Sequence, residues 1–231
     1  MVEDTEKLKE MCLRLGADIF GTADLANLKE KGAIDGHLSK YEFGISIGIA
    51  IPLTVIKELP GLWDIYSEQY TVINRKLDQI SHAVALNIEE KGYAAIPIPA
   101  SRVLGGSGQR GIVSHRAIAM LAGNGWIGKS LNLVTKEYGP RVRFASILTN
   151  MKLNPGKPME TLCGNCRKCI DACIANALKE VDFKYYPESR EEVLDVDRCS
   201  GLLIKNMEDP DIGNKVCGLC IKACPWGKSQ Q

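Results

Sequence analysis

Eight cysteines lie in the last third of this 231-residue chain, and their spacing constrains the fold more than any other feature. The first run, 163–173, reads Cys-x2-Cys-x2-Cys-x3-Cys, and the second, 217–225, reads Cys-x2-Cys-x3-Cys-Pro. The second run lacks a first cysteine, because Asn214 stands at the expected position. Cys199, isolated upstream, is the available replacement, so the pattern supplies two sets of four thiols.

Two 4Fe-4S clusters would use all eight thiolates. In two-cluster ferredoxin modules the last cysteine of each run ligates the other cluster. Two structural zinc sites would also use eight thiolates, but they require neither this spacing nor the terminal Cys-Pro. A disulfide framework is typical of short secreted chains, and the length of this chain and the tight clustering of its cysteines argue for metal instead. The predicted ligands of cluster one are Cys163, Cys166, Cys169 and Cys224, and those of cluster two are Cys173, Cys199, Cys217 and Cys220.

The rest of the composition excludes several classes of protein. A formal net charge of +1 excludes a globally basic nucleic-acid binder. The acidic start, residues 1–4, does not fit a signal peptide, and no apolar run approaches the ~18 residues of a membrane helix. We therefore expect a cytoplasmic protein without membrane association. The ninth cysteine, Cys12, lies on an amphipathic pattern and is expected in the core.

Residues 101–152 carry eight basic side chains and a single acid, Glu137. Such a basic segment suits a phosphate-bearing ligand. A solvated face that compensates the acidic first hundred residues is the other interpretation. Charge alone does not decide between them.

Apolar periodicity predicts an α/β first part and a cysteine-rich second part. The break at 154–158 places the boundary between a cofactor-binding domain, 1–155, and a double-cluster domain, 156–231. We also expect a hairpin from strands 131–135 and 142–148, joined by a turn at 137–140. The predicted helices span 3–15, 64–91 and 114–122, and further strands span 17–21, 44–53 and, near a sheet edge, 94–98.

Two glycine-rich segments resemble phosphate-binding loops. Residues 123–130 match the Gly-x4-Gly-Lys-Ser pattern, but a helix precedes and a strand follows, the reverse of the context that such a loop needs. The pattern Gly106-x-Gly108-x2-Gly111 lacks a good preceding strand and a following acid. A flexible glycine loop is the better interpretation, and such a loop could still cover a ligand.

With both regions in view, the chain resembles the epoxyqueuosine reductase family. Three stretches before the cysteines carry the resemblance: 121–130, 137–140 and 145–150. The ending 217–226 and Asp197-Arg198-Cys199 match as well. Reductive dehalogenases are relatives with the same layout.

The resemblance implies a nitroreductase-like α/β domain followed by a two-cluster ferredoxin-like module. The clusters would reduce a base-off corrinoid, a cobalamin, which in this family reduces an epoxide on transfer RNA. FMN is the second candidate cofactor. By this analogy the corrinoid would be lined by Asn124, Gly125, Trp126, Ile127, Gly128, Lys129 and Ser130, with Lys129 at its polar periphery.

Two departures from the family pattern bear on the substrate. The family's catalytic acid would fall near Gln109, where no acid stands, and the chain ends at Gln231 without the extension that grips transfer RNA. We therefore expect a short relative with a different or unknown acceptor. His115 and Arg116 could supply a proton or a cation beside the cofactor, or be ordinary polar residues at a helix start.

Three functions follow from these observations. The first is a reductase with its own corrinoid or flavin, supplied by an electron donor such as ferredoxin or flavodoxin. The second is an electron carrier or activase that reduces a cofactor held by a partner protein. The third, an ATP-using redox protein, rests only on residues 123–130. A nitroreductase-like domain would also suit a homodimer.

Overall fold

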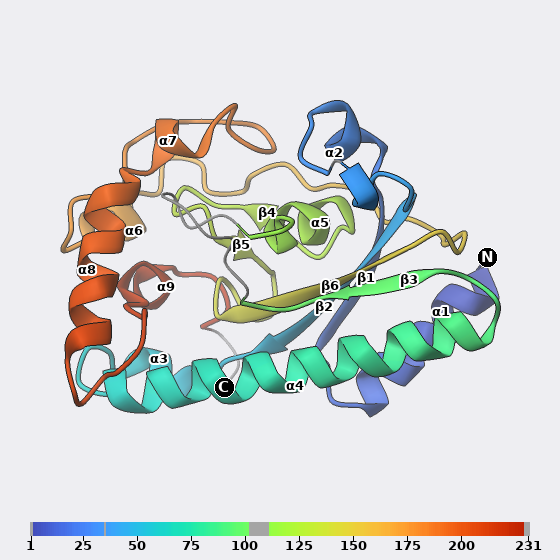
Figure 1. The fold of residues 1–231 in the computed structure, drawn as a ribbon. Helices are drawn as coiled ribbons and strands as arrows, with labels where there is room; N and C mark the ends of the chain where they lie inside the picture. Colours follow the sequence, from blue (N-terminus) through green and yellow to red (C-terminus); the bar gives the residue numbers. More distant parts are fainter. Residues whose placement is uncertain (1, 35, 102–110, 229–231) are drawn as a thin grey trace. The chain divides into compact units, whose positions relative to one another are not determined.

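A computed structural model describes residues 2–34, 36–101 and 111–228. The glycine pattern that begins at Gly106, and Gln109 within it, lie outside the described residues except for Gly111. The fold is mixed α/β (Figure 1). The helices are α1 (Val2–Arg14), α2 (Ala26–Glu30), η1 (Gly36–Leu38), α3 (Leu53–Lys57), α4 (Trp63–Glu90), α5 (His115–Leu121), α6 (Lys168–Asp171), α7 (Arg190–Val193), α8 (Val196–Glu208) and α9 (Leu219–Ala223). The strands are β1 (Ile19–Asp24), β2 (Phe43–Ala50), β3 (Ala95–Ile98), β4 (Trp126–Ile127), β5 (Leu133–Val134) and β6 (Val142–Thr149).

The chain forms two compact units, and it crosses between them several times. The sheet unit contains Met1–Ile49, Ile73–Gly125 and Arg143–Met159. The cysteine unit contains Ala50–Val72, Trp126–Val142 and Glu160–Gln231. Two segments from the first part of the chain therefore pack with the cysteine-rich end. The domain boundary at 155/156 stays a prediction.

The sheet unit is built on four strands in the order β1-β2-β6-β3. β1 pairs antiparallel with β2, with Ile19 opposite Gly48, and β3 pairs antiparallel with β6, with Ala95 opposite Thr149. The edge position of β3, which holds Pro97, was expected because proline cannot donate to a central ladder. β2 is buried along nearly its whole length, as its regular isoleucines predict.

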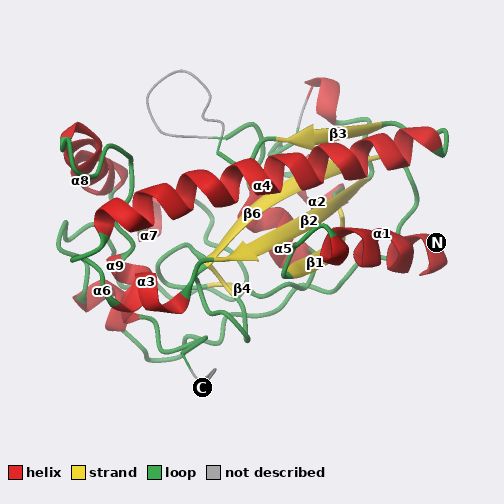
Figure 2. Cartoon of the chain, turned by 90° about the horizontal axis from the view of Figure 1, so that it is seen from below, coloured by secondary structure: helices red, strands yellow, loops and turns green. Residues whose placement is uncertain are grey.

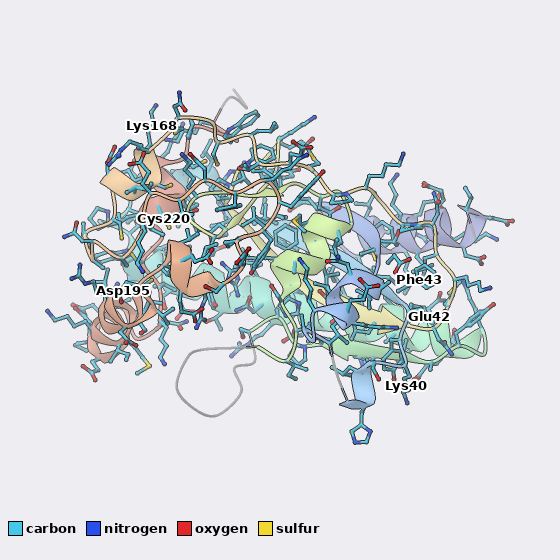
Figure 3. The ribbon with its side chains drawn as sticks, turned by 90° about the horizontal axis from the view of Figure 1, so that it is seen from above. Lys40, Glu42, Phe43, Lys168, Asp195 and Cys220 are labelled. Atoms are coloured by element: carbon cyan, nitrogen blue, oxygen red, sulfur yellow. The ribbon has the colours of Figure 1, made fainter. Side chains whose placement is uncertain are left out.

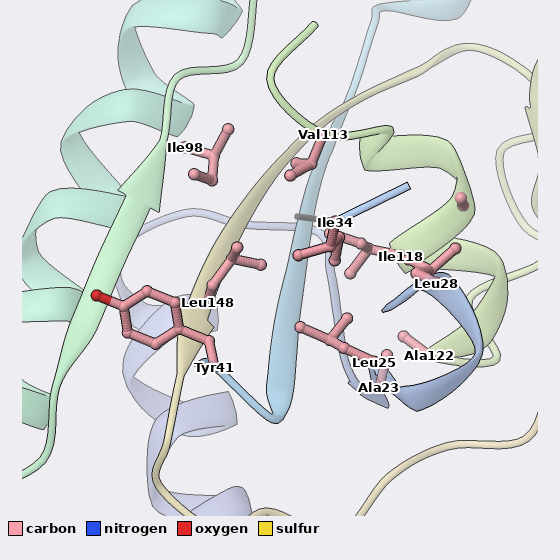
Figure 4. Close-up of a cluster of buried hydrophobic side chains, with 11 residues drawn as sticks. Ala23, Leu25, Leu28, Ile34, Tyr41, Ile98, Val113, Ile118, Ala122 and Leu148 are labelled. Carbon is pink, nitrogen blue, oxygen red and sulfur yellow. The ribbon is translucent and has the colours of Figure 1, made fainter. Parts of the chain in front are cut away.

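Helices cover both faces of this sheet. α1 and the part of α4 within the sheet unit lie on one face, and α2 and α5 lie on the other (Figures 1 and 2). Gly44 on β2 permits close contact, because a Cβ there would lie 3.0 Å from the side chains of both Ile118 and Leu25. Ser114 caps α5, as predicted, by accepting a hydrogen bond from the Ala117 amide at 3.2 Å. The core on the α5 face (Figure 4) contains Ala23, Leu25, Leu28, Ile34, Tyr41, Ile98, Val113, Ala117, Ile118, Ala122 and Leu148.

The predicted hairpin of 131–135 with 142–148 is wrong. β5 pairs instead with β4, whereas β6 enters the large sheet between β2 and β3. The turn itself exists, since Thr135 and Gly139 form an isolated bridge. β6 is buried at seven of its eight positions, and a two-stranded hairpin could not cover so apolar a strand. Among the described residues, no helix is long and apolar enough to cross a membrane.

Candidate iron–sulfur centre

The first cysteine run occupies a loop and one short helix in the cysteine unit. The Cys166 amide donates to the Cys163 carbonyl at 3.0 Å, which folds the chain between them. Gly164 has φ +48°, a left-handed conformation that costs glycine little. Cys169 lies on α6, and Cys173 follows its end. The x2 spacings thus place Cys163 and Cys166 on one turn and Cys169 on the short helix that follows it.

The second run spans α9. Cys217 precedes the helix, Cys220 lies within it and Cys224 is its C-cap. Gly218 begins the helix with φ +76°, and a Cβ at this position would lie 2.8 Å from the Leu59 side chain. Glycine is therefore required both by the backbone and by the packing.

Residues 50–72 support this second run. The indole Nε1 of Trp63 donates to the Cys217 carbonyl at 2.6 Å, and Lys222 Nζ donates to the Leu59 carbonyl at 2.6 Å. Asn214, which occupies the position of the missing cysteine, donates through Nδ2 to Thr71 Oγ1 at 3.3 Å. Asn214 thus holds the chain before α9 in place, although it cannot be a thiolate ligand.

Cys199 lies in the first turn of α8. The side chain of Asp195 caps this helix by accepting from the Arg198 amide at 3.0 Å. In the view of Figure 3, Cys220 lies between Lys168, on α6, and Asp195. The cysteine-bearing helices α6, α8 and α9 all belong to the cysteine unit.

Three other thiols lie close enough to Cys169 to act on its charge. Burial first, and then the charges of Cys163, Cys224 and Cys166, raise the pKa of Cys169 to about 11. Burial and the charges of Cys163 and Cys166 also raise the pKa of Cys224. Cys224 thus neighbours the first run, from which it is separated by more than fifty residues.

A second group forms around Cys220. Burial first, and then the charges of Cys217, Cys169, Cys199 and Cys173, raise the pKa of Cys220 to about 12. Burial raises the pKa of Cys217 too, and Cys173 adds to this effect. Cys169 acts on both groups, so the two sets of thiols are adjacent.

The donor set fits a group that carries positive charge. Buried thiolates repel one another and lose hydration, which disfavours their negative charge. A metal centre compensates that charge and holds the sulfurs deprotonated. All nine cysteines are free of disulfides. Among the described residues, no group of three or more His, Cys, Asp or Glu is arranged to hold a single metal ion. Cys12 lies in the core, as predicted, and burial raises its pKa to about 12.

Residues 126–139 pack around the cysteine runs. Gly128 lies against Cys163, because a Cβ at Gly128 would be 3.5 Å from the Cys163 Sγ. Asn132 Nδ2 donates to Cys220 Sγ at 3.6 Å. Trp126 is fully buried. The sequence contained no signal for the Asn132 contact, which joins residues 88 positions apart.

Lys129 is buried beside the first run. Its ammonium Nζ lies 2.9 Å from Asp182 Oδ1, and the Lys129 side chain is only 6% exposed. The hydrogen bond that the Lys129 ammonium donates to Asp182 is the main cause of a raised Lys129 pKa, and the charges of Asp182, Glu180 and Cys163 contribute. An open cavity of about 200 Å³ adjoins this pair, lined by Lys129, Thr161, Gly164, Asn165, Val181, Asp182 and Phe183.

The residues predicted to bind an organic cofactor are divided between the units. Asn124 and Gly125 are the last residues of the segment Ile73–Gly125 of the sheet unit. Trp126–Ser130 belong to the cysteine unit. Asn124 Nδ2 is buried and has no hydrogen-bond partner among the described residues. The preceding helix and following strand agree with the expectation that 123–130 is not a triphosphate loop. Binding of an organic cofactor here stays a prediction.

His115 is held as a neutral ring in the sheet unit. Its Nε2 donates to the Pro99 carbonyl at 3.1 Å, so Nδ1 is left to accept from the Ser146 hydroxyl at 2.9 Å. Burial lowers the pKa of His115 to about 4, and the nearby charges of Arg143 and Arg116 act in the same direction. The structure thus favours a structural role for His115 over a proton donor.

Comparison with known proteins agrees with this geometry. Residues 162–227 match the family profile of the 4Fe-4S double cluster binding domain. An epoxyqueuosine reductase of Bacillus cereus is 35% identical over 120 residues, which are 51% of this chain and 30% of that protein. One from Synechococcus is 37% identical over 121 residues, 48% of this chain and 35% of that protein. This chain is similar to epoxyqueuosine reductases.

The chain spans about a third of the length of the epoxyqueuosine reductases that it matches in sequence. A tetrachloroethene reductive dehalogenase of Desulfitobacterium hafniense is 27% identical over 165 residues, 65% of this chain and 27% of that protein. Solved structures of reductive dehalogenases and of epoxyqueuosine reductases share the fold of this chain. A catabolic reductive dehalogenase superposes with a TM-score of 0.77 at 21% identity, over 98% of this chain and 32% of that one. An epoxyqueuosine reductase superposes with a TM-score of 0.65 at 23% identity, over 99% and 67%.

Proposed function

We propose that this chain is an iron–sulfur oxidoreductase, which passes electrons through two 4Fe-4S clusters to a bound organic cofactor. The grouping of eight thiols into two neighbouring sets carries the proposal, since it agrees with the crossed ligation that the cysteine spacing predicts. The match of 162–227 to a double cluster binding domain supports it independently.

In this proposal the chain holds two one-electron carriers side by side. Cys163, Cys166, Cys169 and Cys224 ligate cluster one, and Cys173, Cys199, Cys217 and Cys220 ligate cluster two. The protein's own contribution is to hold the thiolates in place, shield them from water and donate hydrogen bonds to sulfur. The Ala177 amide, 3.3 Å from Cys173 Sγ, is one such donor.

We propose a corrinoid as the organic cofactor, with FMN as the second candidate. A reductive dehalogenase of the same fold is described as acting in B12-dependent dehalogenation, which supports the first choice. The buried Asn124 Nδ2, which lacks a partner among the described residues, is a donor suited to a polar ligand. Lys129 is not available for the corrinoid periphery in this structure, because Asp182 engages its ammonium.

A second candidate function is an electron carrier or activase that serves a partner's cofactor. Its support is that Trp126–Ser130, the stretch expected to line the corrinoid, packs within the cysteine unit. In either case we propose ferredoxin or flavodoxin as electron donor, a nitroreductase-like sheet unit and a homodimer. One epoxyqueuosine reductase was solved with a transfer RNA stem loop, so transfer RNA is the first macromolecule to test.

The deciding experiment is a titration of anaerobically purified, cluster-loaded protein with cob(II)alamin and then with FMN. Binding of either, detected as a change in its absorption bands, supports the oxidoreductase. Gly125→Val should weaken binding without loss of iron, because the new side chain fills space next to the proposed ligand. Gly201→Val is the matched control, since nothing lies within 4 Å of a Cβ there. Absence of binding by both cofactors would favour the electron carrier.

A further inference from the structure

A tight turn at 128–132 presents one side chain to the second group of cysteines. The Leu131 amide donates to the Gly128 carbonyl at 2.8 Å, and the Gly128 amide donates to the Asn132 carbonyl at 2.9 Å. Leu131 has φ +58°, which is rare for a residue with a branched side chain. A strained conformation of this kind persists only where the surrounding structure holds it. The backbone of Asn132 is therefore fixed from both sides.

The side-chain amide of Asn132 has two recipients for its two N–H groups. Nδ2 lies 3.6 Å from Cys220 Sγ and 3.2 Å from Ser130 Oγ. An amide nitrogen carries two hydrogens, so both contacts can be made together. All four residues of this arrangement, including Gly128, belong to the cysteine unit.

We propose that Asn132 raises the reduction potential of the cluster that Cys220 ligates. This inference deepens the proposed function and rests on it. Reduction adds one negative charge, which spreads onto the ligand sulfurs, and an N–H dipole aimed at sulfur stabilises the reduced state more than the oxidised one. Asn132 would thus act through Cys220 as a positioning residue, without contact with the iron.

Residues 128–132 give the two groups of cysteines different polar neighbours. Cys163, in the first group, has the backbone of Gly128 and the charge of Lys129 nearby. Cys220, in the second group, has the neutral amide of Asn132. Loss of the amide should therefore move one potential and leave the other in place, which provides an internal control.

The test is an anaerobic redox titration, followed by EPR, of wild type, Asn132→Asp and Asn132→Leu. The leucine variant lacks the donor, and we expect about a tenfold lower equilibrium constant for one-electron reduction of cluster two, a shift of 59 mV to more negative potential. The aspartate variant has the same shape but adds negative charge, so its shift should be larger. The potential of cluster one is the internal control and should stay unchanged in both variants.

Iron and sulfide are measured first on every variant. Wild type without cubane clusters would contradict the proposed function, whereas loaded variants with unchanged potentials would overturn only the role of Asn132. If the variants lose a cluster, pulsed EPR of reduced wild type decides. An exchangeable proton coupled to cluster two, together with a ¹⁴N coupling that ¹⁵N labelling of asparagine replaces by a ¹⁵N coupling, supports the proposal, and their absence refutes it.

Discussion

Trp126 and Trp226 meet edge to face within the cysteine unit, with ring centroids 4.8 Å apart and ring planes at 76°. Trp126 is fully buried, and Trp226 stands two residues after Cys224. Gly139 and Gly227, both with positive φ, let the flanking backbones pass where no side chain would fit. The tryptophan pair thereby fastens the end of the second cysteine run to residues 126–142.

Replacing Trp226 should destabilise the cysteine unit. Trp226→Ala removes the ring that covers Trp126, and we expect the free energy of unfolding to fall by about 3 kcal/mol. Urea denaturation of cluster-loaded protein, followed by circular dichroism, measures this change. Tyr186→Ala is the control, because Tyr186 is 36% exposed and its loss should cost less than about 0.5 kcal/mol. Equal effects of the two variants would contradict the role of the pair.

The metal content follows directly from the two ligand sets. Anaerobically prepared protein should contain about eight irons and about eight acid-labile sulfides per chain, because each cubane has four of each. Metal analysis and a sulfide assay measure both. About two zinc ions per chain, without sulfide, would replace the iron–sulfur assignment with two tetrahedral sites.

Cys199 should be needed by one cluster and not by the other. Cys199→Ser is expected to lose about half of the iron and one of two EPR signals, since only cluster two would use this residue. Cys12→Ala is the matched cysteine control. Cys12 is buried in the sheet unit, so this variant should lose stability but keep its full iron content. Full iron in Cys199→Ser would remove Cys199 from the site.

Two glycines should respond in opposite ways to alanine. At Gly128 the new Cβ would lie 2.8 Å from the Val134 side chain and 3.5 Å from Cys163 Sγ, so we expect a loss of about 1–3 kcal/mol and weaker binding of cluster one. Gly201, on α8, has open space, and Gly201→Ala should stabilise by about 0.5–1 kcal/mol. Thermal unfolding and iron analysis compare the pair. A stable, fully loaded Gly128→Ala protein would contradict the close approach.

His115 should make stability depend on pH. Its pKa is about 4 in the folded chain and ordinarily 6.5, so below pH 6.5 the unfolded state binds a proton that the folded state does not. Stability is therefore retained above pH 6.5 and lost as pH falls, by about 2 kcal/mol between pH 7 and pH 5. His115→Gln should lose less stability over that range. Urea midpoints across this range test the difference, and identical slopes would contradict a partly buried neutral ring.

Local patterns in the sequence predicted several elements well. The periodicity of residues 64–91 predicted α4, and Ser114 was recognised as the cap of α5, because both features are set by neighbours within one or two turns. The regular isoleucines of β2 and the proline of edge strand β3 were equally informative. These signals depend on near neighbours and therefore survive without tertiary structure.

Pairing between distant segments was not accessible in this way. Strands β5 and β6 are joined by a genuine turn, yet they enter different sheets, because β6 can bury both its faces only inside the larger one. A turn sequence cannot report what will cover the strand that follows it.

By itself the sequence determined the number and spacing of the thiols, since the reach of a few residues limits which cysteines can surround one cubane. Only the tertiary structure decided what surrounds those thiols. It placed Asn132 against Cys220, Trp126 against Trp226 and Lys129 against Asp182, in each case across more than fifty residues. The physical reason is that burial, ion pairing and hydrogen bonding to sulfur depend on the packing of remote segments, which spacing along the chain does not encode.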